Sequence, residues 1–469
     1  MKHVVRLTWI AALLILLTSY LQPVASTFLT GTGTAAAQAD LASSCQPPTP
    51  PTQEARLPAP SFGVDARFGY NVVLYGDTLV VGAHLEDHTR RVDGVDRPDA
   101  GAVYVYVRDG GAWTQQARLT ASNADEYDGF GYAVALHQDT LAVGAIYERS
   151  SATGVDGDQA DNGTYSAGAV YVFIRTGGTW SQQAYVKASN TGFEDHFGDR
   201  IALYGDTMVV GVESEDSSGT GVDGDQSDDG AEDSGAVYVF EREGGAWAQQ
   251  AYLKSSNSQA RDWFGRGVAV FEDTLVVGAR GEDSGAPGID ADQTDESASG
   301  SGAVYVFTRA GATWTQQTYV KSPAPAPNDG FGGSVALDGD TLVVGAAYDD
   351  GEATDSGAVF VYERAGRDWT LRARLTSPQP AELQYFGSAL SLHEDALAVG
   401  VPFDAGNASA ASGAVYLFRR CDGAWSEPVQ VTSAVPRANN QFGRSVALHG
   451  GTLVVGAYME GNGAAYVFR

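Results

Sequence analysis

The stretch Phe331-Gly-Gly-Ser-Val-Ala-Leu337, a polar turn, and Thr341-Leu-Val-Val-Gly-Ala346 together carry the pattern that decides the fold. After a loop the chain continues with Gly357-Ala-Val-Phe-Val-Tyr362, and a second turn leads to Trp369, which opens a further strand-like segment. The second segment is apolar at consecutive positions, so both of its faces must be buried. The third is rich in β-branched and aromatic residues, which suit a packed pleated surface. The stretch therefore predicts a sheet of four short antiparallel strands.

The same unit recurs along the whole chain. Its opening Phe-Gly pair begins at seven positions, which are Phe68, Phe130, Phe197, Phe264, Phe331, Phe386 and Phe442. A four-stranded sheet with two apolar faces needs a neighbour on each side, and radial repetition supplies both while leaving only short exposed edges. The repeats therefore predict an all-β fold, a seven-bladed β-propeller of four-stranded antiparallel blades. A linear solenoid is the competing interpretation.

The two ends of the repeat array favour the ring. The seventh unit reaches Arg469 directly after its third strand and has no fourth. The segment Thr52-Gln-Glu-Ala-Arg-Leu57 matches the fourth-strand segment Thr114-Gln-Gln-Ala-Arg-Leu119, in the same register as the Phe-Gly pairs. We therefore expect an N-terminal strand to complete the last blade, because closure removes exposed sheet edges. The expected organisation is a signal peptide over residues 1–39, a Pro-rich linker over 40–51 and the propeller over 52–469.

Phe-Gly opening each unit and Gly-Ala ending its second strand resemble FG-GAP repeats, which form the seven-bladed propeller of integrin alpha chains and of many bacterial exported proteins. The resemblance covers residues 52–469 and implies extracellular placement, calcium sites, and binding or cell-adhesion roles. The sequence departs from the integrin pattern at one place. In integrins the calcium loop lies between the first two strands of a blade. Here that link is a tight turn such as Gly76-Asp77, and one Asp cannot surround an ion that takes six to eight oxygens. These Asp residues are interpreted as turn formers.

The N-terminus has the features of an export signal. A basic start with Lys2 and Arg6 precedes a mostly apolar run, and Ala37-Gln-Ala39 fits a cleavage site. An uncleaved anchor is the alternative. The prediction is a secreted or cell-envelope protein with no membrane span in the mature chain. Cys45 and Cys421 would both lie in the exported part, where they either form a disulfide or remain two free thiols.

The formal net charge of −29 limits the partners. Nucleic acid is excluded, because phosphate binding needs a basic face, and anionic membrane surfaces are disfavoured. Cations, basic proteins and neutral glycans remain, and solubility alone is the alternative explanation of the charge. We expect a monomer that binds an extracellular protein or glycan.

Three long loops between second and third strands repeat one acidic phrase, which begins at Gly154, Gly221 and Gly288. Their spaced carboxylates suggest ligands for a hard cation such as Ca²⁺. The candidate metal ligands are Asp156, Asp158, Asp161, Asp223, Asp225, Asp228, Asp290, Asp292 and Asp295. The alternative is a set of solvated loops copied when the blades were duplicated. The fourth-to-first-strand links add further acids, among them Asp128, Asp195, Asp262 and Asp329, which we expect to ring the central opening.

Tryptophan occurs at the start of six of the seven fourth-strand segments, as in Trp113 and Trp180, with Pro51 in its place in the N-terminal one. This repetition favours outer-strand packing over a sugar-binding array. Trp263 breaks the pattern, because it directly precedes Phe264 in a link between blades. It is the candidate ligand-binding aromatic residue.

Catalytic motifs are missing from the sequence. There is no nucleophile elbow and no phosphate-cradling Gly loop, and His84 and His88 have no evident third metal ligand. No catalytic residue is assigned, and an enzymatic role is not expected. The leading hypothesis is an exported binding or adhesion propeller that uses an acidic loop face, with calcium as a candidate cofactor. The alternatives are a polysaccharide hydrolase or lyase acting in the central cleft and a purely structural surface module.

Overall fold

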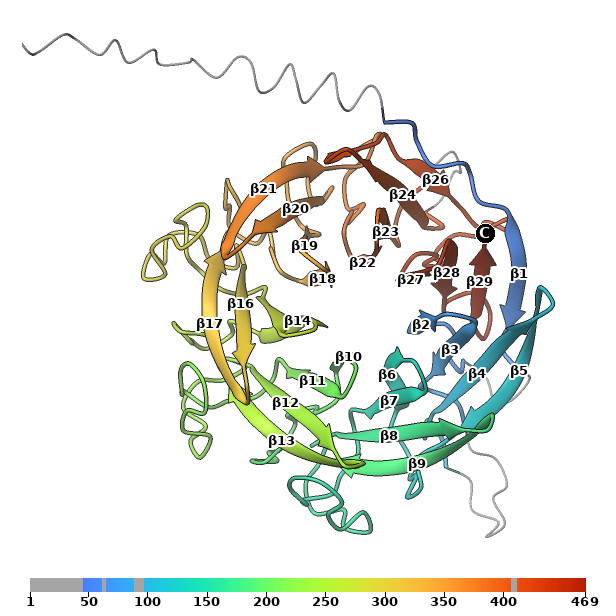
Figure 1. Cartoon of the computed structure of the whole chain (residues 1–469), viewed down its shortest axis with the longest axis vertical. Coiled ribbons are helices and arrows are strands. Elements are labelled where there is room, and N and C mark those ends of the chain that lie inside the picture. The colour runs from blue at the N-terminus through green and yellow to red at the C-terminus, as the bar shows by residue number, and fades with distance from the viewer. Residues whose placement is uncertain (1–44, 61–64, 88–96, 406–410) are drawn as a thin grey trace, which may run out of the picture. The chain divides into compact units, whose positions relative to one another are not determined.

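Figure 1 shows the computed structural model of the chain, which describes residues 45–60, 65–87, 97–405 and 411–469. These residues form seven antiparallel sheets around a central axis, with the first strand of each sheet innermost. The predicted seven-bladed propeller is confirmed, and the solenoid is excluded. The predicted signal peptide, residues 1–39, and His88 lie outside the described residues. The part of the chain that the structure describes contains no helix long and apolar enough to cross a membrane.

The strands follow the repeats along the chain. Blade 1 holds β2 (Val72–Tyr75), β3 (Thr78–Ala83), β4 (Ala102–Asp109) and β5 (Ala112–Leu119). Blade 2 holds β6 (Phe130–His137), β7 (Thr140–Ala145), β8 (Ala169–Thr176) and β9 (Thr179–Val186). Blade 3 holds β10 (Arg200–Tyr204), β11 (Thr207–Val212), β12 (Ala236–Glu243) and β13 (Ala246–Leu253). Blade 4 holds β14 (Phe264–Phe271), β15 (Thr274–Ala279), β16 (Ala303–Ala310) and β17 (Thr313–Val320).

The remaining blades are similar, with a change in the outer strand of blade 6. Blade 5 holds β18 (Ser334–Asp338), β19 (Thr341–Ala346), β20 (Ala358–Ala365) and β21 (Asp368–Leu375). Blade 6 holds β22 (Ala389–His393), β23 (Ala396–Val401), β24 (Ala414–Cys421) and a divided outer strand, β25 (Ala424–Trp425) and β26 (Val429–Val431). Blade 7 holds β27 (Ser445–His449), β28 (Thr452–Ala457), β29 (Ala464–Phe468) and β1 (Gln53–Pro58).

The two glycines of the repeat meet at the boundary between blades. A Cβ atom on Gly278, the residue before the end of β15, would collide with the carbonyl oxygen of Gly332 in the next blade. The same collision would occur between Gly456 in blade 7 and Gly69 in blade 1, so the ring closes with the same contact that joins its other blades. The Phe of each pair is fully buried beside the aromatic residues of its own third strand, as for Phe331 and Phe360 at 5.5 Å. The Phe-Gly and Gly-Ala pairs therefore set how closely the blades pack.

The N-terminal strand closes the ring as predicted. β1 pairs antiparallel with β29, with Pro58 opposite Ala464, and Thr52 and Arg469 exchange backbone hydrogen bonds of 2.8 and 2.9 Å. Cys45 and Cys421 form a disulfide with their Cα atoms 5.5 Å apart, which resolves the two alternatives left by the sequence. The bridge attaches the segment before β1 to the end of β24.

The outer layer joins neighbouring blades through one repeated arginine. Arg364 on β20 contacts Asp340 of its own turn at 2.8 Å and donates to the Thr274 hydroxyl of the preceding blade at 2.8 Å. Its guanidinium also lies over the ring of Trp369, 5.2 Å from the centroid. The turn Asp residues therefore anchor an arginine in addition to forming the turn, and the tryptophan is buried in packing.

Candidate functional site

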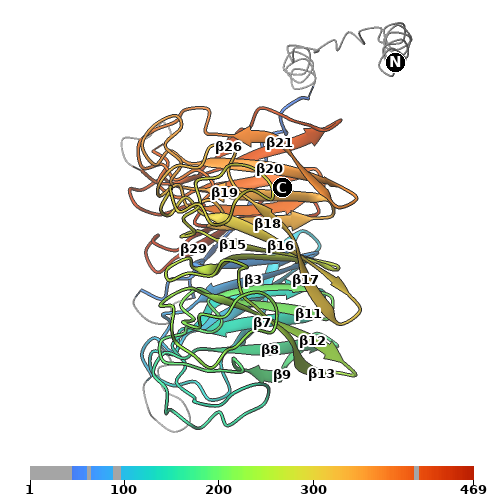
Figure 2. The same cartoon turned by 90° about the vertical axis from the view of Figure 1, so that its left-hand side faces the viewer.

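The long links between strands gather on one side of the ring, and the short hairpins lie on the other (Figure 2). We call the side with the long links the loop face. It carries the links between second and third strands, such as 146–168, and those between blades, such as 187–196. The predicted concentration of long loops on one face is therefore present, and each candidate residue can be placed on it.

The first aspartate of each acidic phrase holds its loop against the outer strand. Asp156 adopts a left-handed conformation with φ of 55°, and its carboxylate accepts the N–H of Tyr185 at 3.0 Å. Asp223 and Asp290 make the equivalent bonds to Tyr252 and Tyr319, each at 2.9 Å. These three carboxylates fix the path of the loop.

The second and third aspartates serve turns within the same loops. Asp158 accepts the N–H of Ala160 at 2.9 Å, and Asp161 accepts the N–H of Ser151 at 2.7 Å. Asp225, Asp228 and Asp292 repeat these bonds in the other loops, and Asp295 accepts the N–H of Ser297 at 3.0 Å. Hydrogen bonding to the hydroxyl and N–H of Ser227 holds the pKa of Asp225 below its ordinary value.

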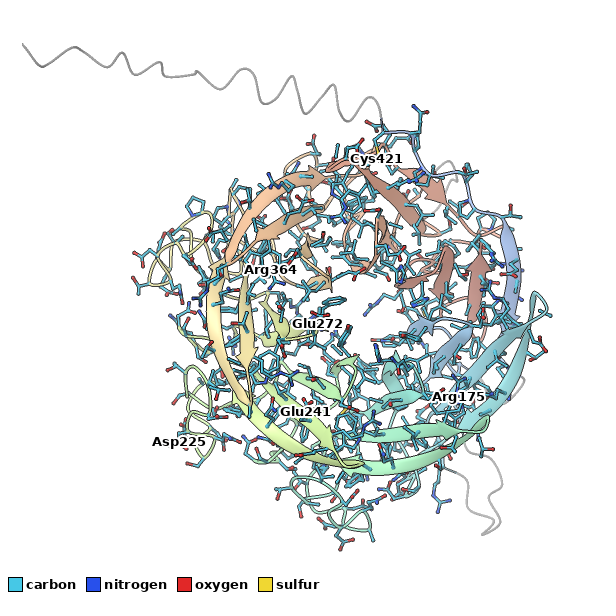
Figure 3. The ribbon with its side chains drawn as sticks, viewed as in Figure 1. Arg175, Asp225, Glu241, Glu272, Arg364 and Cys421 are labelled. Atoms are coloured by element: carbon cyan, nitrogen blue, oxygen red, sulfur yellow. A yellow bond between two sulfur atoms is a disulfide. The ribbon has the colours of Figure 1, made fainter. Side chains whose placement is uncertain are left out.

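The carboxylates of these aspartates do not gather around one point. Across the described ranges, no three side chains of Asp, Glu, His or Cys are grouped so that they could hold a metal ion. Asp225 lies on a loop outside the ring, away from the axis (Figure 3). The arrangement does not fit a calcium site, which needs six to eight oxygens around one point. Calcium binding by these loops stays a prediction that this geometry does not support.

The expectation of exposed acids around the central opening is wrong for four of them. Asp128, Asp195, Asp262 and Asp329 are buried, with 2 to 6% of their surface exposed. Each accepts the backbone N–H of the residue three positions earlier, at 2.6 to 2.9 Å. Burial raises the pKa of Asp262 to about 8 and that of Asp128 to about 7. These carboxyls brace the links between blades instead of facing solvent.

A second set of acids is also structural. Each blade buries one carboxylate at the start of its loop, and these residues are Glu86, Glu148, Glu215, Glu282, Asp349, Asp404 and Glu460. In blades 2 to 4 a buried lysine from the segment after the outer strand neutralises it, as Lys254 does for Glu215 at 2.9 Å. In blade 5 the partner is Arg374, which lies 2.7 Å from Asp349 and is one-third exposed.

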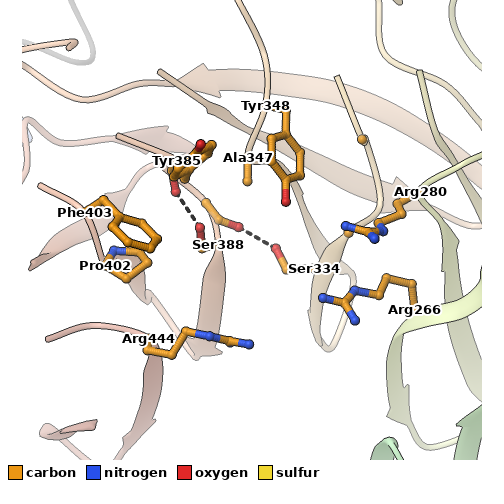
Figure 4. Close-up of a pocket in the computed structure, with 13 residues that line it drawn as sticks. Arg266, Arg280, Ser334, Ala347, Tyr348, Tyr385, Ser388, Pro402, Phe403 and Arg444 are labelled. Carbon is orange, nitrogen blue, oxygen red and sulfur yellow. Dashed lines mark hydrogen bonds between the residues drawn. The ribbon is translucent and has the colours of Figure 1, made fainter. Parts of the chain in front are cut away.

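The residue that follows each Phe-Gly pair varies around the ring. In chain order these residues are Tyr70, Tyr132, Asp199, Arg266, Gly333, Ser388 and Arg444, and the last four of them line one cavity. Blades 5 and 6 thus have a glycine and a serine where blades 1 and 2 have tyrosines. A cavity of about 330 Å³ lies at these two small residues, between Arg266, Arg444 and Phe403 (Figure 4).

Aromatic side chains and arginines form the walls of this cavity. Tyr348, Tyr385 and Phe403 line it in an edge-to-face series, with ring centroids 5.3 and 5.5 Å apart. Arg280 joins Arg266 and Arg444 in the lining, and in Figure 4 the guanidinium groups point toward the open space between the strands.

Trp263, the predicted ligand-binding aromatic residue, lies beside this cavity. The guanidinium of Arg280 stacks on its indole, 4.7 Å from the ring centroid. Trp263 lines a smaller cavity of about 230 Å³ that shares Arg280, Gly330 and Tyr348 with the larger one. The role of Trp263 in ligand binding stays a prediction.

His84 directly follows β3 in blade 1 and belongs to no metal-ligand group among the residues that the structure describes. It is buried between Tyr70 and Tyr132, with ring centroids 4.3 and 5.2 Å away. Burial, together with the positive charges of Arg67 and Arg444, lowers its pKa to about 3. His84 is therefore a neutral packing residue at ordinary pH.

Seven segments of the chain match the FG-GAP repeat family model, and they are residues 51–106, 113–173, 180–240, 247–307, 314–362, 369–418 and 425–468. The chain belongs to the FG-GAP repeat family. Each matched segment of this FG-GAP propeller begins with the outer strand of one blade and continues through the first three strands of the next. The first segment includes β1, so the sequence repeat itself spans blade boundaries and accounts for the closure. Among curated proteins no significant match to the chain is found.

The sequence prediction missed the arginines and aromatic residues of the opening. The available signal was the position directly after Phe-Gly, which changes in size and charge from unit to unit while the pair beside it stays constant. A variable position next to a fixed packing motif indicates a side chain that faces open space, here the central channel.

Proposed function

We propose that this FG-GAP propeller is an exported or cell-surface binding module that recognises a protein or glycan through its loop face. The observation that carries the proposal is the central cavity, whose wall presents Tyr348 and Phe403 with 39 and 38% of their surface exposed. Exposed aromatic residues in a concave site on a rigid scaffold are typical of ligand recognition. Export is supported by the basic and apolar N-terminal sequence and by the extracellular placement common in the family.

Binding is favoured over glycoside cleavage at this place. Glycosidases use a pair of carboxyl groups on either side of the scissile bond. The residues that line the central cavity include no Asp or Glu. The acids directly next to lining residues, Asp329, Asp349 and Asp404, are buried in structural contacts.

Capture experiments with the purified mature protein test the proposal. Glycan arrays and pull-downs from extracellular extracts would be run with the wild type and with Tyr348→Ala combined with Phe403→Ala. The matched control is Leu371→Ala on the outer strand β21, where the side chain is 36% exposed. We expect the loop-face variant to lose the captured ligand and the control to keep it. Retention by both variants would exclude the central loop face as the binding surface.

A further inference from the structure

The central cavity carries a local charge opposite to that of the whole protein. The chain has a formal net charge of −29, yet the cavity lining contains three arginines and no carboxylate. Arg266 forms an ion pair with Glu213 at 2.8 Å. Arg280 and Arg444 have no carboxylate within ion-pair distance among the described residues. The cavity is therefore an electropositive site within an acidic molecule.

One of these arginines also has an unsatisfied donor. The Nε atom of Arg280 is buried and has no hydrogen-bond partner in the structure. The stacking on Trp263 holds this guanidinium in place without satisfying the donor. The buried Nε itself is out of reach of a ligand in the cavity, but the terminal N–H groups of this fixed guanidinium lie in the lining and match the two oxygens of a carboxylate. The geometry thus favours an anionic ligand group beside Arg280.

The rest of the cavity suits a ring with hydroxyl groups. The Ser334 hydroxyl donates to the carbonyl of Gly387 at 2.6 Å, and the Ser388 hydroxyl donates to the carbonyl of Tyr385 at 2.7 Å (Figure 4). Their oxygens keep lone pairs that accept hydrogen bonds from ligand hydroxyls. The rings of Tyr348 and Phe403 offer apolar surface on the same cavity. A volume of about 330 Å³ is at the lower end for ligand cavities and limits the ligand to a small group.

We propose that this cavity binds a carboxylated sugar residue, with Arg280 and Arg444 contacting the carboxylate and the aromatic wall contacting the sugar ring. The inference rests on the proposed binding function and adds its ligand chemistry. A single acidic residue fits better than a polyanion, because the acidic loops of blades 2 to 4 repel a polymer that carries many charges. A bare inorganic anion would use the arginines and leave the aromatic wall and the serine acceptors without a role.

Calorimetric titration of the purified mature protein tests this. The probes are glucuronate, glucose as its neutral counterpart, inorganic phosphate, and a short peptide with a free carboxyl end. The variants are Arg280→Gln combined with Arg444→Gln, and Ser388→Tyr, which places in blade 6 the residue found at the equivalent position of blade 2. The control is Arg261→Gln, an exposed arginine paired with exposed Glu232 at 2.9 Å. Thermal melting of each variant checks that the fold is retained.

We expect saturable glucuronate binding that is stronger than glucose binding. The double arginine variant should weaken it by about tenfold or more, since hydrogen bonds between charged groups are lost, while the control stays within about twofold. Ser388→Tyr should abolish binding in a folded protein. Equal affinity for glucose and glucuronate, tighter binding of phosphate or of the peptide, or unchanged binding by the folded variants would overturn the proposal. If glucuronate fails while capture still depends on Tyr348 and Phe403, only this inference fails and the binding function stands.

Discussion

Blades 2 to 4 and blades 5 and 6 are built from the same repeat, but they depart from one another on the loop face. Blades 2 to 4 are near copies, each with a long acidic loop and a buried lysine and glutamate pair such as Lys254 and Glu215. Blades 5 and 6 have shorter loops and place Gly333 and Ser388 at the axis, where the cavity opens. The glycine contacts that join the blades are the same in both regions, and the cavity forms where the residue after the Phe-Gly pair changes.

The largest expected effect tests the part of the repeat that both regions share. Gly278→Val would drive a side chain into the backbone of Gly332 at the boundary between blades 4 and 5. We expect the free energy of unfolding to fall by more than about 4 kcal/mol, or the protein not to fold. Urea denaturation measures this. Gly177→Asn is the control, because it lies in a hairpin turn with open space around it and should cost less than about 1 kcal/mol. Similar losses at both sites would disprove the close contact between blades.

The second-largest effect compares blade 3 with blade 5, which neutralise the buried carboxylate of the loop with different cations. Lys254→Met leaves Glu215 buried without its cation and should cost about 3 kcal/mol. Arg374→Met in blade 5 should cost only about 1 kcal/mol, because this arginine is one-third exposed and water replaces it. Adding Glu215→Gln to Lys254→Met should recover part of the loss. Equal costs in both blades would show that burial does not distinguish the two pairs.

A smaller effect concerns how the stability depends on pH through Asp262, which lies two positions before the Phe-Gly pair of its blade. Burial raises the pKa of Asp262 to about 8, so the folded state holds a proton that the unfolded chain releases near pH 4. The bound proton stabilises the folded state fully below about pH 4. This stabilisation is lost as the pH rises from about 4 toward 8, with a slope of up to about 1.4 kcal/mol per pH unit.

Asp262→Asn should remove this slope, which urea denaturation at several pH values would detect. Blade 6 already has a neutral amide there, since Gln384 accepts the N–H of Ala381 at 3.3 Å. Gln384→Asn, which exchanges one amide for another, is therefore the control and should leave the pH dependence as it is in the wild type. An unchanged slope in Asp262→Asn would contradict the raised pKa.

The smallest effect is expected from calcium. Because the carboxylates of Asp156 and Asp158 are used by backbone N–H groups, millimolar Ca²⁺ should change the melting temperature very little, and chelation should do the same. Asp156→Ala with Asp158→Ala should lower the melting temperature equally with and without the ion. A clear rise with Ca²⁺ that the double variant abolishes would establish the predicted metal site and show that the loops rearrange around it.

The fold was predictable from sequence because its packing contacts repeat. The contact of Gly278 in blade 4 with Gly332 in blade 5 has an equivalent at every blade boundary, and the spacing of β1 from the next outer strand revealed the closure. The site was less predictable, because sequence spacing does not show which way a loop side chain points. Asp262 looked exposed in a polar link, yet it folds inward onto a backbone N–H. The amide of Gln384 at the equivalent position was the available signal, since it shows that an acceptor is needed there and a charge is not.

Because β1 pairs with β29, blade 7 can be completed only after β29 has been synthesised. Gln53 pairs with Phe468, so the first strand to be synthesised waits for the last before it has a partner. Contacts between residues so distant in sequence carry a large loop-closure entropy and slow folding. Cys421 precedes β29 in the chain, so its bridge to Cys45 can form earlier and hold the waiting strand near the place where its partner will arrive.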